Sequence, residues 1–230
     1  MAIVQFSYLF DERSFLNIIS PIVPEIEAGN YVPLLDIAKK TLRSEPRLWN
    51  LLYDLNLGYT FDEEEEGELD AGSLLMKVMV KYLQPISTTH DAWRMLQPVF
   101  PIVGWSSTDA NLLLYGRSLC DLLVPQQQLS PKPYRSPQLY GKPNWPWCEV
   151  IAGWLDFDTA SRLSNQLGNY KTQILQVATT PPEAIRTEYA NVQGYSDEWY
   201  SEKLTSAYEY IQNVFNEIVK SKTSLALAIA

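Results

Sequence analysis

The chain of 230 residues has little of the side-chain chemistry on which many enzyme sites depend. It contains a single histidine, His90, and two cysteines, Cys120 and Cys148, which lie far apart in the sequence. A zinc site needs several clustered histidine, cysteine or carboxylate ligands, and a disulfide framework needs several cysteines. We therefore predict neither a metal site nor a disulfide framework. Two isolated thiols suit a reducing cytoplasm.

The short motifs of several common enzyme classes are also missing. The sequence has no G-x-S-x-G nucleophile elbow, no GxxxxGK[ST] phosphate loop and no G-x-G-x-x-G dinucleotide loop. A serine or cysteine nucleophile would have to use His90 as its base. His90 stands in TTHDAW, where we expect an exposed residue in the first turn of a helix. The sequence favours a protein without catalytic residues or a cofactor.

Positive charge and long apolar runs are scarce. The formal net charge is −9 and the sequence pI is about 4.7, which argues against binding to the phosphate backbone of nucleic acids. The short basic stripe of Lys39, Lys40, Arg43 and Arg47 is typical of the solvent face of a helix. No uncharged apolar run approaches the roughly 20 residues needed to cross a bilayer, and we see no secretory signal. We expect a cytoplasmic protein that binds neither nucleic acid nor membrane.

The apolar content is ample for a folded core, with 46% apolar residues that include seven Trp and 14 Tyr. Residues 2–9 are rich in β-branched and aromatic side chains and predict a strand. Residues 223–229 form an apolar run that must be buried, and we predict that they pair with the first strand. Apolar residues at three- and four-residue steps predict helices over much of the rest. We therefore predict a single α+β domain, predominantly helical, whose small sheet contains both chain ends.

Capping residues predict where several helices begin. They precede apolar segments with helical spacing at Asp11, at Ser106, at Asp156 or Asp158, and at Ser196 or Asp197. We expect the helix after Ser106 to run to Pro125, with Gly116 packed closely against another backbone. Residues 73–83 are expected to form a helix that ends before Pro85, and residues 88–97 to form a further turn or two.

Residues 125–147 divide the sequence into a helical front part, 1–124, and a back part, 148–230. The dividing segment holds six of the 15 prolines and four aromatic residues. Proline fixes φ and lacks a backbone donor, so this segment is extended or turning. Its aromatic residues distinguish it from a disordered linker, and we expect it to pack across the surface of the domain.

An acidic run, DEEEEGELD, occupies residues 62–70 and places seven carboxylates in nine positions. Such a run repels itself and normally stays solvated. A cation site is an alternative, but the run lacks the alternating ligands and fixed glycine of an EF-hand loop. If the run has a function, we expect Glu63, Glu64, Glu65 and Glu66 to present negative charge to a basic partner protein.

Aromatic rings and carboxylates are interleaved where the back part begins. The residues concerned are Tyr140, Trp145, Trp147, Glu149, Trp154, Asp156 and Asp158. Carboxylates among flat aromatic faces suit a sugar or a cationic ligand, and two suitably spaced acids support glycoside hydrolysis. Packing anchors and helix caps explain the same residues, and we favour that interpretation.

Three functional hypotheses follow from these patterns. We favour a non-catalytic interaction module, similar in kind to immunity or adaptor proteins, that presents an acidic surface to a basic partner. The second hypothesis is a small-molecule or carbohydrate-binding protein, or a hydrolase, that uses the aromatic and carboxylate residues between 140 and 158. The third is a structural subunit of a larger assembly.

Overall fold

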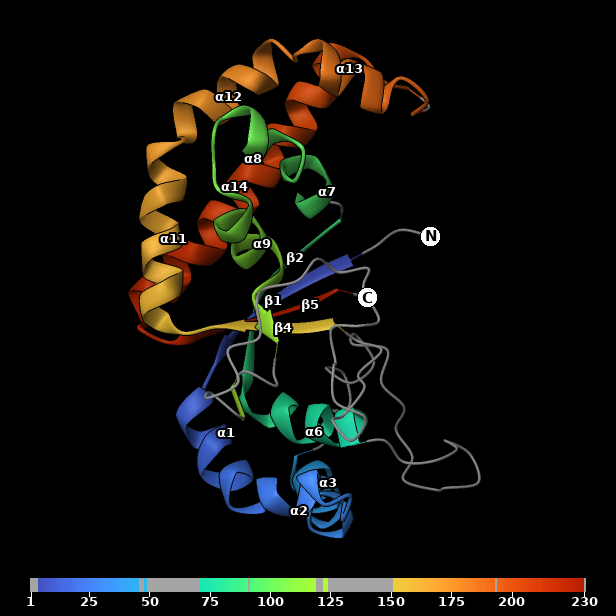
Figure 1. The fold of residues 1–230 in the computed structure, drawn as a ribbon, viewed down its shortest axis with the longest axis vertical. Coiled ribbons are helices and arrows are strands. Elements are labelled where there is room, and N and C mark those ends of the chain that lie inside the picture. Colours follow the sequence, from blue (N-terminus) through green and yellow to red (C-terminus); the bar gives the residue numbers. More distant parts are fainter. Residues whose placement is uncertain are drawn as a thin grey trace.

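The computed structural model shows a five-stranded antiparallel sheet with helices on both faces (Figure 1). The fold is α+β and mainly helical, as predicted. The structure describes residues 4–45, 48, 71–90, 92–118, 122–123, 151–192 and 194–229.

The sheet brings the two ends of the chain together. Its strands are β1 (Val4–Phe10), β2 (Leu83–His90), β3 (Arg117–Ser118), β4 (Ile151–Leu155) and β5 (Ser224–Ile229), in the order β2-β1-β5-β4-β3. β1 and β5 pair from Gln5 opposite Ile229 to Phe10 opposite Ser224. This pairing confirms the prediction that the two terminal segments form adjacent strands. The apolar segment at the C-terminus becomes the central strand, which helices cover on both faces.

The helices form one layer above the sheet and another below it in Figure 1. The upper layer contains α7 (Ala92–Leu96), α8 (Val99–Ile102), α9 (Ser107–Tyr115), α11 (Phe157–Asn169), α12 (Lys171–Thr179), α13 (Glu183–Tyr189) and α14 (Asp197–Ser221). The lower layer contains α1 (Glu12–Ile19), α2 (Val23–Glu27), α3 (Val32–Ser44) and α6 (Ala71–Met79). Two 3₁₀ turns, η1 (Ser20–Ile22) and η2 (Val80–Tyr82), extend α1 and α6.

Alternation along the strands divides the buried side chains into two cores. Leu155, Leu225 and Leu227 belong to the core under the upper helices, which we call the upper core. Their neighbours Trp154 and Ala226 belong to the core against the lower helices, the lower core. Successive side chains on a strand point to opposite faces, so each strand supplies both cores.

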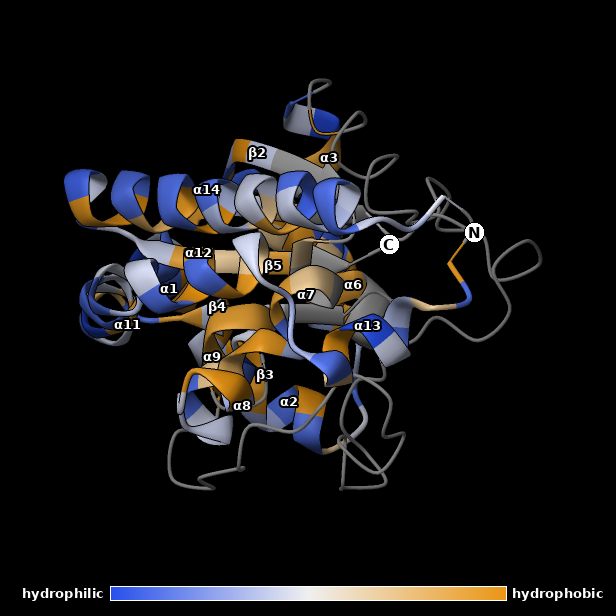
Figure 2. Cartoon of the chain, turned by 90° about the horizontal axis from the view of Figure 1, so that it is seen from above, coloured by the Kyte–Doolittle hydropathy of each residue, from blue (hydrophilic) through white to orange (hydrophobic). Residues whose placement is uncertain are grey.

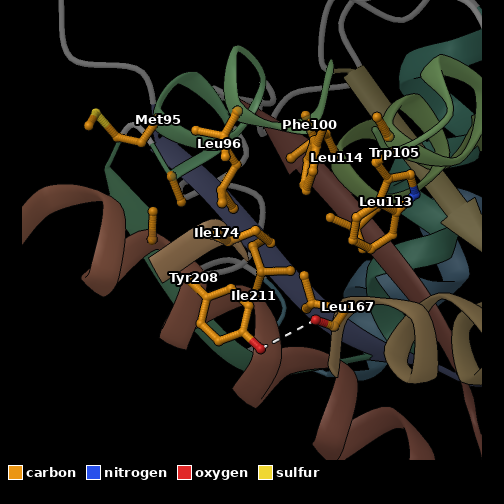
Figure 3. Close-up of a cluster of buried hydrophobic side chains, with 14 of the residues drawn as sticks. Met95, Leu96, Phe100, Trp105, Leu113, Leu114, Leu167, Ile174, Tyr208 and Ile211 are labelled. Carbon is orange, nitrogen blue, oxygen red and sulfur yellow. Dashed lines mark hydrogen bonds between the residues drawn. The ribbon is translucent and has the colours of Figure 1, made fainter. Parts of the chain in front are cut away.

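Helix α14 is the main support of the upper core. Its apolar residues recur at helical spacing, and the buried side chains include those predicted to face inward: Leu204, Ala207, Tyr208, Ile211, Phe215 and Ile218. Figure 2 shows apolar colour on one edge of α14 and polar colour on the other. In Figure 3, Tyr208 lies among the aliphatic side chains and donates a hydrogen bond of 3.4 Å to the carbonyl oxygen of Leu167.

A polar contact joins α14 to the sheet. The Tyr210 hydroxyl lies 2.7 Å from the hydroxyl of Ser7 on β1 and 3.4 Å from the carbonyl oxygen of Ser87 on β2. Burial raises the pKa of Tyr210 to about 12, so the phenol stays protonated at neutral pH. A buried Ser7 (1% exposed) is tolerated on this face because the phenol satisfies its hydroxyl.

Strand β2 was not predicted from the sequence. The helix expected over residues 73–83 ends at Met79, and after η2 the chain forms an eight-residue strand that includes Pro85. Proline is compatible with this strand because β2 lies at the edge of the sheet, and the register with β1 shifts between Ser7 and Tyr8, opposite Pro85. His90 is the last residue of β2, so its expected place in the first turn of a helix was wrong.

The predicted end of the helix after Ser106 was also wrong. Helix α9 ends at Tyr115, and Gly116 adopts a φ of +68° before the short strand β3. A positive φ favours glycine, which explains why the helix stops there. The expected close approach at Gly116 is confirmed. A Cβ atom there would lie 2.7 Å from the backbone nitrogen of Trp154.

The capping predictions were largely correct. The side chains of Asp11, Ser106, Asp156 and Ser196 each accept a hydrogen bond from the backbone amide three residues later, at 2.7–3.1 Å. Each cap satisfies one of the amides that the first turn of a helix leaves without an intrahelical acceptor. The local sequence is sufficient for such caps because donor and acceptor are only three residues apart.

Several predictions concern residues outside the described part of the chain. They are the acidic run with Glu63–Glu66, the segment 125–147, and the candidate ligand-binding residues Tyr140, Trp145, Trp147 and Glu149. The two cysteines and most of the helix expected after Ser44 lie there too. These predictions stand as they were made.

Candidate functional site

Three of the predicted aromatic and carboxylate residues fall in the described part, where β4 meets α11. Trp154 lies near the end of β4, Asp156 precedes α11 and Asp158 lies in its first turn. Together with Arg117 of β3 and Thr159 of α11, Trp154 and Asp156 form a group that we call the strand-end joint. The structure brings these four side chains together, whereas Asp158 is exposed.

Trp154 anchors the strand-end joint in the lower core, where it is 6% exposed. It lies opposite Arg117 in the β3–β4 ladder, and the Arg117 guanidinium carbon is 6.0 Å from the centre of the indole ring. A cation at this distance from an aromatic face is attracted by the ring. The Trp154 ring is therefore a packing anchor that already has a cation beside it.

Asp156 has hydrogen-bond donors at both carboxylate oxygens. Oδ1 accepts from the Thr159 amide at 2.7 Å, and Oδ2 accepts from the Thr159 hydroxyl at 2.8 Å. Oδ2 also lies 3.2 Å from a guanidinium nitrogen of Arg117, which donates to the Thr159 hydroxyl through its other terminal nitrogen. A carboxylate that caps a helix and holds an arginine is poorly suited to be a general base. Its role is to fix the start of α11 against β3.

Two glycines allow the backbones to cross beside the strand-end joint. A Cβ atom on Gly153 would lie 1.7 Å from the carbonyl oxygen of Tyr115, well inside any possible contact. The turn at Gly116 thus lies directly against β4, and no larger residue fits at Gly153. This close crossing is what places Arg117 over Trp154.

A second ion pair lies at the neighbouring contact between α9 and α11. Arg162 donates to Asp109 at 2.9 Å, and Gln166 donates to the other carboxylate oxygen at 3.3 Å. These bonds hold the pKa of Asp109 below its usual range, with the hydrogen bond from Arg162 as the largest cause. Asp109 lies in the first turn of α9, and its side-chain partners come from 53 and 57 residues later.

An aromatic cluster that the sequence did not single out lies where α13 meets the start of α14. Its rings are those of Tyr189, Tyr195, Trp199 and Tyr200, with centroids 5.3–6.4 Å apart. Tyr189 and Tyr200 are buried, whereas Tyr195 and Trp199 are half-buried at the surface. Aromatic pairs at these distances stabilise one another beyond the area they bury.

An ion pair closes one side of this cluster. Two guanidinium nitrogens of Arg186 donate to the two carboxylate oxygens of Asp197 at 3.3 and 2.8 Å, and the Tyr195 hydroxyl donates to the same carboxylate at 3.2 Å. The bond from Arg186 is the largest cause of the lowered pKa of Asp197. Partial burial, and then the bond to Asp197, raise the pKa of Tyr195.

Other carboxylates around the cluster are not neutralised in this way. Glu183, Glu188, Glu198 and Glu202 are exposed. Within the described part of the chain, none of the four forms an ion pair or a side-chain hydrogen bond. Acidic side chains near a helix N-terminus are favoured by its dipole, which accounts for Glu183 and Glu198 in part. The result is a surface where two half-buried rings lie among unpaired negative charges.

The described residues contain neither a candidate group of metal ligands nor a candidate membrane-spanning helix. Among them, no group of three or more His, Cys, Asp or Glu side chains is placed to hold a metal ion. No helix in the same part of the chain combines the length and the apolar character that crossing a bilayer requires. Lys77 of α6 is buried in the lower layer, with 1% exposure, and the sequence did not indicate this burial.

Comparison with known proteins gives no relative from which a function can be transferred. No protein-family model matches the sequence, and neither a curated protein nor a solved structure matches it.

Proposed function

We propose that this protein is a non-catalytic interaction module that presents an acidic surface to a basic partner protein, and that it acts in the cytoplasm. The observation that carries the proposal is the group of exposed carboxylates around half-buried aromatic rings at the start of α14, which have no ion-pair partner among the described residues. The net charge of −9 and the acidic run at residues 62–70 are consistent with it. Complementary charge accelerates association and selects partners of opposite sign.

The alternative, a ligand-binding protein or hydrolase, has less support. Of its candidate residues in the described part, Trp154 is buried and Asp156 is held by Thr159 and Arg117. A glycosidase needs two carboxyl groups that flank the glycosidic bond, one as general acid and the other as nucleophile or general base. The contacts of Asp156 favour a role in the strand-end joint, and the alternative now depends on the exposed Asp158 and on residues outside the described part, including Glu149.

The test is a binding measurement with a partner captured from the native cell, identified, and purified for reconstitution. We expect the dissociation constant to rise about tenfold between about 50 and about 300 mM salt, because exposed charges are screened over that range. A complex whose affinity does not change with salt contradicts the proposal.

The contribution of the acidic run is measured in the same assay. Replacement of Glu63, Glu64, Glu65 and Glu66 by glutamine is expected to weaken the complex and to reduce its salt dependence. The control is Glu27→Gln with Asp36→Asn, which removes exposed charge from α2 and α3 without touching the run. Equal weakening by the run variant and the control would show that net charge, and not a docking surface, governs binding.

A further inference from the structure

The surface at the start of α14 has the composition of a protein-binding site. We call it the α13–α14 patch and define it as Glu188, Tyr195, Glu198, Trp199 and Glu202. Trp and Tyr are enriched among the residues that dominate binding energy, because they offer a large contact area with few rotatable bonds. Both rings of the patch are half-buried and held in place by Tyr189, whose ring centroid is 6.3 Å from Tyr195 and 6.4 Å from Trp199.

Two acidic residues of the patch lie within three positions of Trp199 on α14. Glu202 is three residues after Trp199, and residues three or four apart on a helix are surface neighbours. Glu198 precedes Trp199 and lies on the same exposed face as Glu202, four residues later. Neither carboxylate has an ion-pair partner in the described part of the chain. Glu202 is therefore the carboxylate closest along the helix surface to a cation over the indole ring, and Glu198 lies one turn before Glu202.

The only arginine of α13 does not fill this role. Arg186 is committed to Asp197 through two hydrogen bonds on the other side of the aromatic cluster. Lys203 is exposed on α14 four residues after Trp199, but in the described part of the chain no ion pair joins it to Glu198 or Glu202. The three carboxylates of the patch therefore still outnumber this cation.

The aromatic cluster also contains a buried hydroxyl. Tyr200 is 0% exposed, and its hydroxyl has no hydrogen-bond partner among the residues that the structure describes. Its ring packs against those of Tyr189 and Tyr195, at 5.3 and 6.4 Å. Burial, followed by the charges of Tyr189, Glu188 and Tyr195, raises the pKa of this phenol.

We propose that the α13–α14 patch binds an arginine-bearing segment of a partner protein, with one guanidinium stacked on the Trp199 ring and hydrogen-bonded to Glu198 and Glu202. This inference rests on the proposed function and specifies its contact surface and chemistry. Arginine fits better than lysine because its planar guanidinium stacks on an aromatic ring and donates to two carboxylate oxygens at once. Negative charge on the patch excludes a nucleic acid as the occupant.

The test uses labelled nine-residue Gly/Ser peptides that carry three arginines, three lysines or three citrullines, with binding to the full chain followed by fluorescence anisotropy. We expect the arginine peptide to bind at least about threefold more tightly than the lysine peptide, because stacking adds to the shared charge attraction. Citrulline keeps the planar shape but loses the charge, and its peptide is expected not to bind.

Variants assign the binding to the patch. Trp199→Ala and Glu198→Gln with Glu202→Gln are each expected to weaken the arginine peptide about tenfold, while Trp199→Phe retains part of the affinity. Glu209→Gln is the matched control, since Glu209 is an exposed, unpaired acid on the same helix outside the patch. Circular dichroism of each variant verifies that α14 is folded.

Two outcomes overturn the inference. One is equal affinity for the arginine and lysine peptides; the other is equal weakening by Glu209→Gln and by the patch variants. The native complex could prove sensitive to salt but keep its affinity in the patch variants. That result would leave the proposed function in place and refute this surface alone. A native complex that is insensitive to salt, together with peptide binding at the patch, would refute the general proposal instead.

Discussion

The strand-end joint and the α13–α14 patch are built from similar side chains but differ in the exposure and the hydrogen bonding of those side chains. In the joint, Trp154 is 6% exposed and both oxygens of Asp156 accept hydrogen bonds. In the patch, Trp199 is half-buried, and Glu198 and Glu202 are exposed without partners in the described part. The difference shows that similar aromatic and acidic side chains can be held in contacts within the fold or remain exposed, depending on which segments pack beside them.

The backbone crossing beside the joint gives the largest expected effect. We expect Gly153→Ala to lower the free energy of unfolding by about 3 kcal/mol or more, because the new methyl group would overlap the Tyr115 carbonyl oxygen and push α9 away from β4. Urea denaturation measures this change. A variant that is too unstable to be obtained as soluble protein would also agree with the prediction.

Gly194, in the loop that leads to the patch, is the matched control. It has a φ of +81° but open space around its Cα atom, so Gly194→Ala costs only the left-handed conformation, about 1 kcal/mol. Gly153 has no positive φ, so its substitution carries no such conformational cost. If Gly153→Ala costs no more stability than Gly194→Ala, the tight crossing at the joint is refuted.

The carboxylates of α11 give an intermediate effect. Asp156→Ala is expected to lower the free energy of unfolding by about 1–2 kcal/mol, because it removes the cap of α11 and leaves Arg117 without its carboxylate. Asp158→Ala, in the same first turn but exposed, should change it by about 0.5 kcal/mol or less. Chemical denaturation of the pair measures both values. An Asp156 variant as stable as wild type would mean that the joint is not structural and would revive Asp156 as a ligand-binding residue.

The smallest expected effect is a pH dependence at Asp109. Its pKa is lowered in the folded protein, mainly by the hydrogen bond from Arg162, so it binds protons more weakly there than in the unfolded chain. The resulting stabilisation is present above the unfolded pKa of about 4 and is lost as pH falls through the folded value. Asp109→Asn should therefore reduce the acid-induced loss of the free energy of unfolding by up to about 1 kcal/mol between about pH 5 and pH 2.

Asp197 is the comparison for this measurement. Its pKa is also lowered by an arginine, but its pair with Arg186 lies at the surface beside the patch, where water screens both charges. Asp197→Asn should therefore change the acid-induced loss of the free energy of unfolding less than Asp109→Asn does. The opposite order would show that the surface pair near the patch is the stronger structural contact.

Local patterns in the sequence were sufficient for much of the fold. The caps at Asp11, Ser106 and Ser196 and the inward stripe of α14 depend on residues three or four positions apart, so the sequence alone predicts them. The apolar C-terminal segment required burial, and pairing with the first strand provided it. Strand β2 was missed because Pro85 normally interrupts a strand, and only its place at the sheet edge makes that residue acceptable.

The candidate site was much less predictable. Asp156 and Trp154 were singled out because they are close in sequence, but Arg117, which holds both, comes from a strand about 40 residues earlier. Trp199 was not singled out from the sequence, and no local signal distinguishes it from Tyr200, one residue later. Their difference in burial depends on how α13 crosses the start of α14.

The sequence by itself determined an acidic chain with a predominantly helical α+β fold and adjacent terminal strands, because these properties follow from composition and from patterns between near neighbours. The tertiary structure alone decided which charged groups are paired or buried within the fold. It paired Asp109 with Arg162 and Asp156 with Arg117, buried Lys77, and left Glu198 and Glu202 unpaired among the described residues. The physical reason is that pairing and burial depend on distances between segments far apart in the chain, which no local pattern encodes.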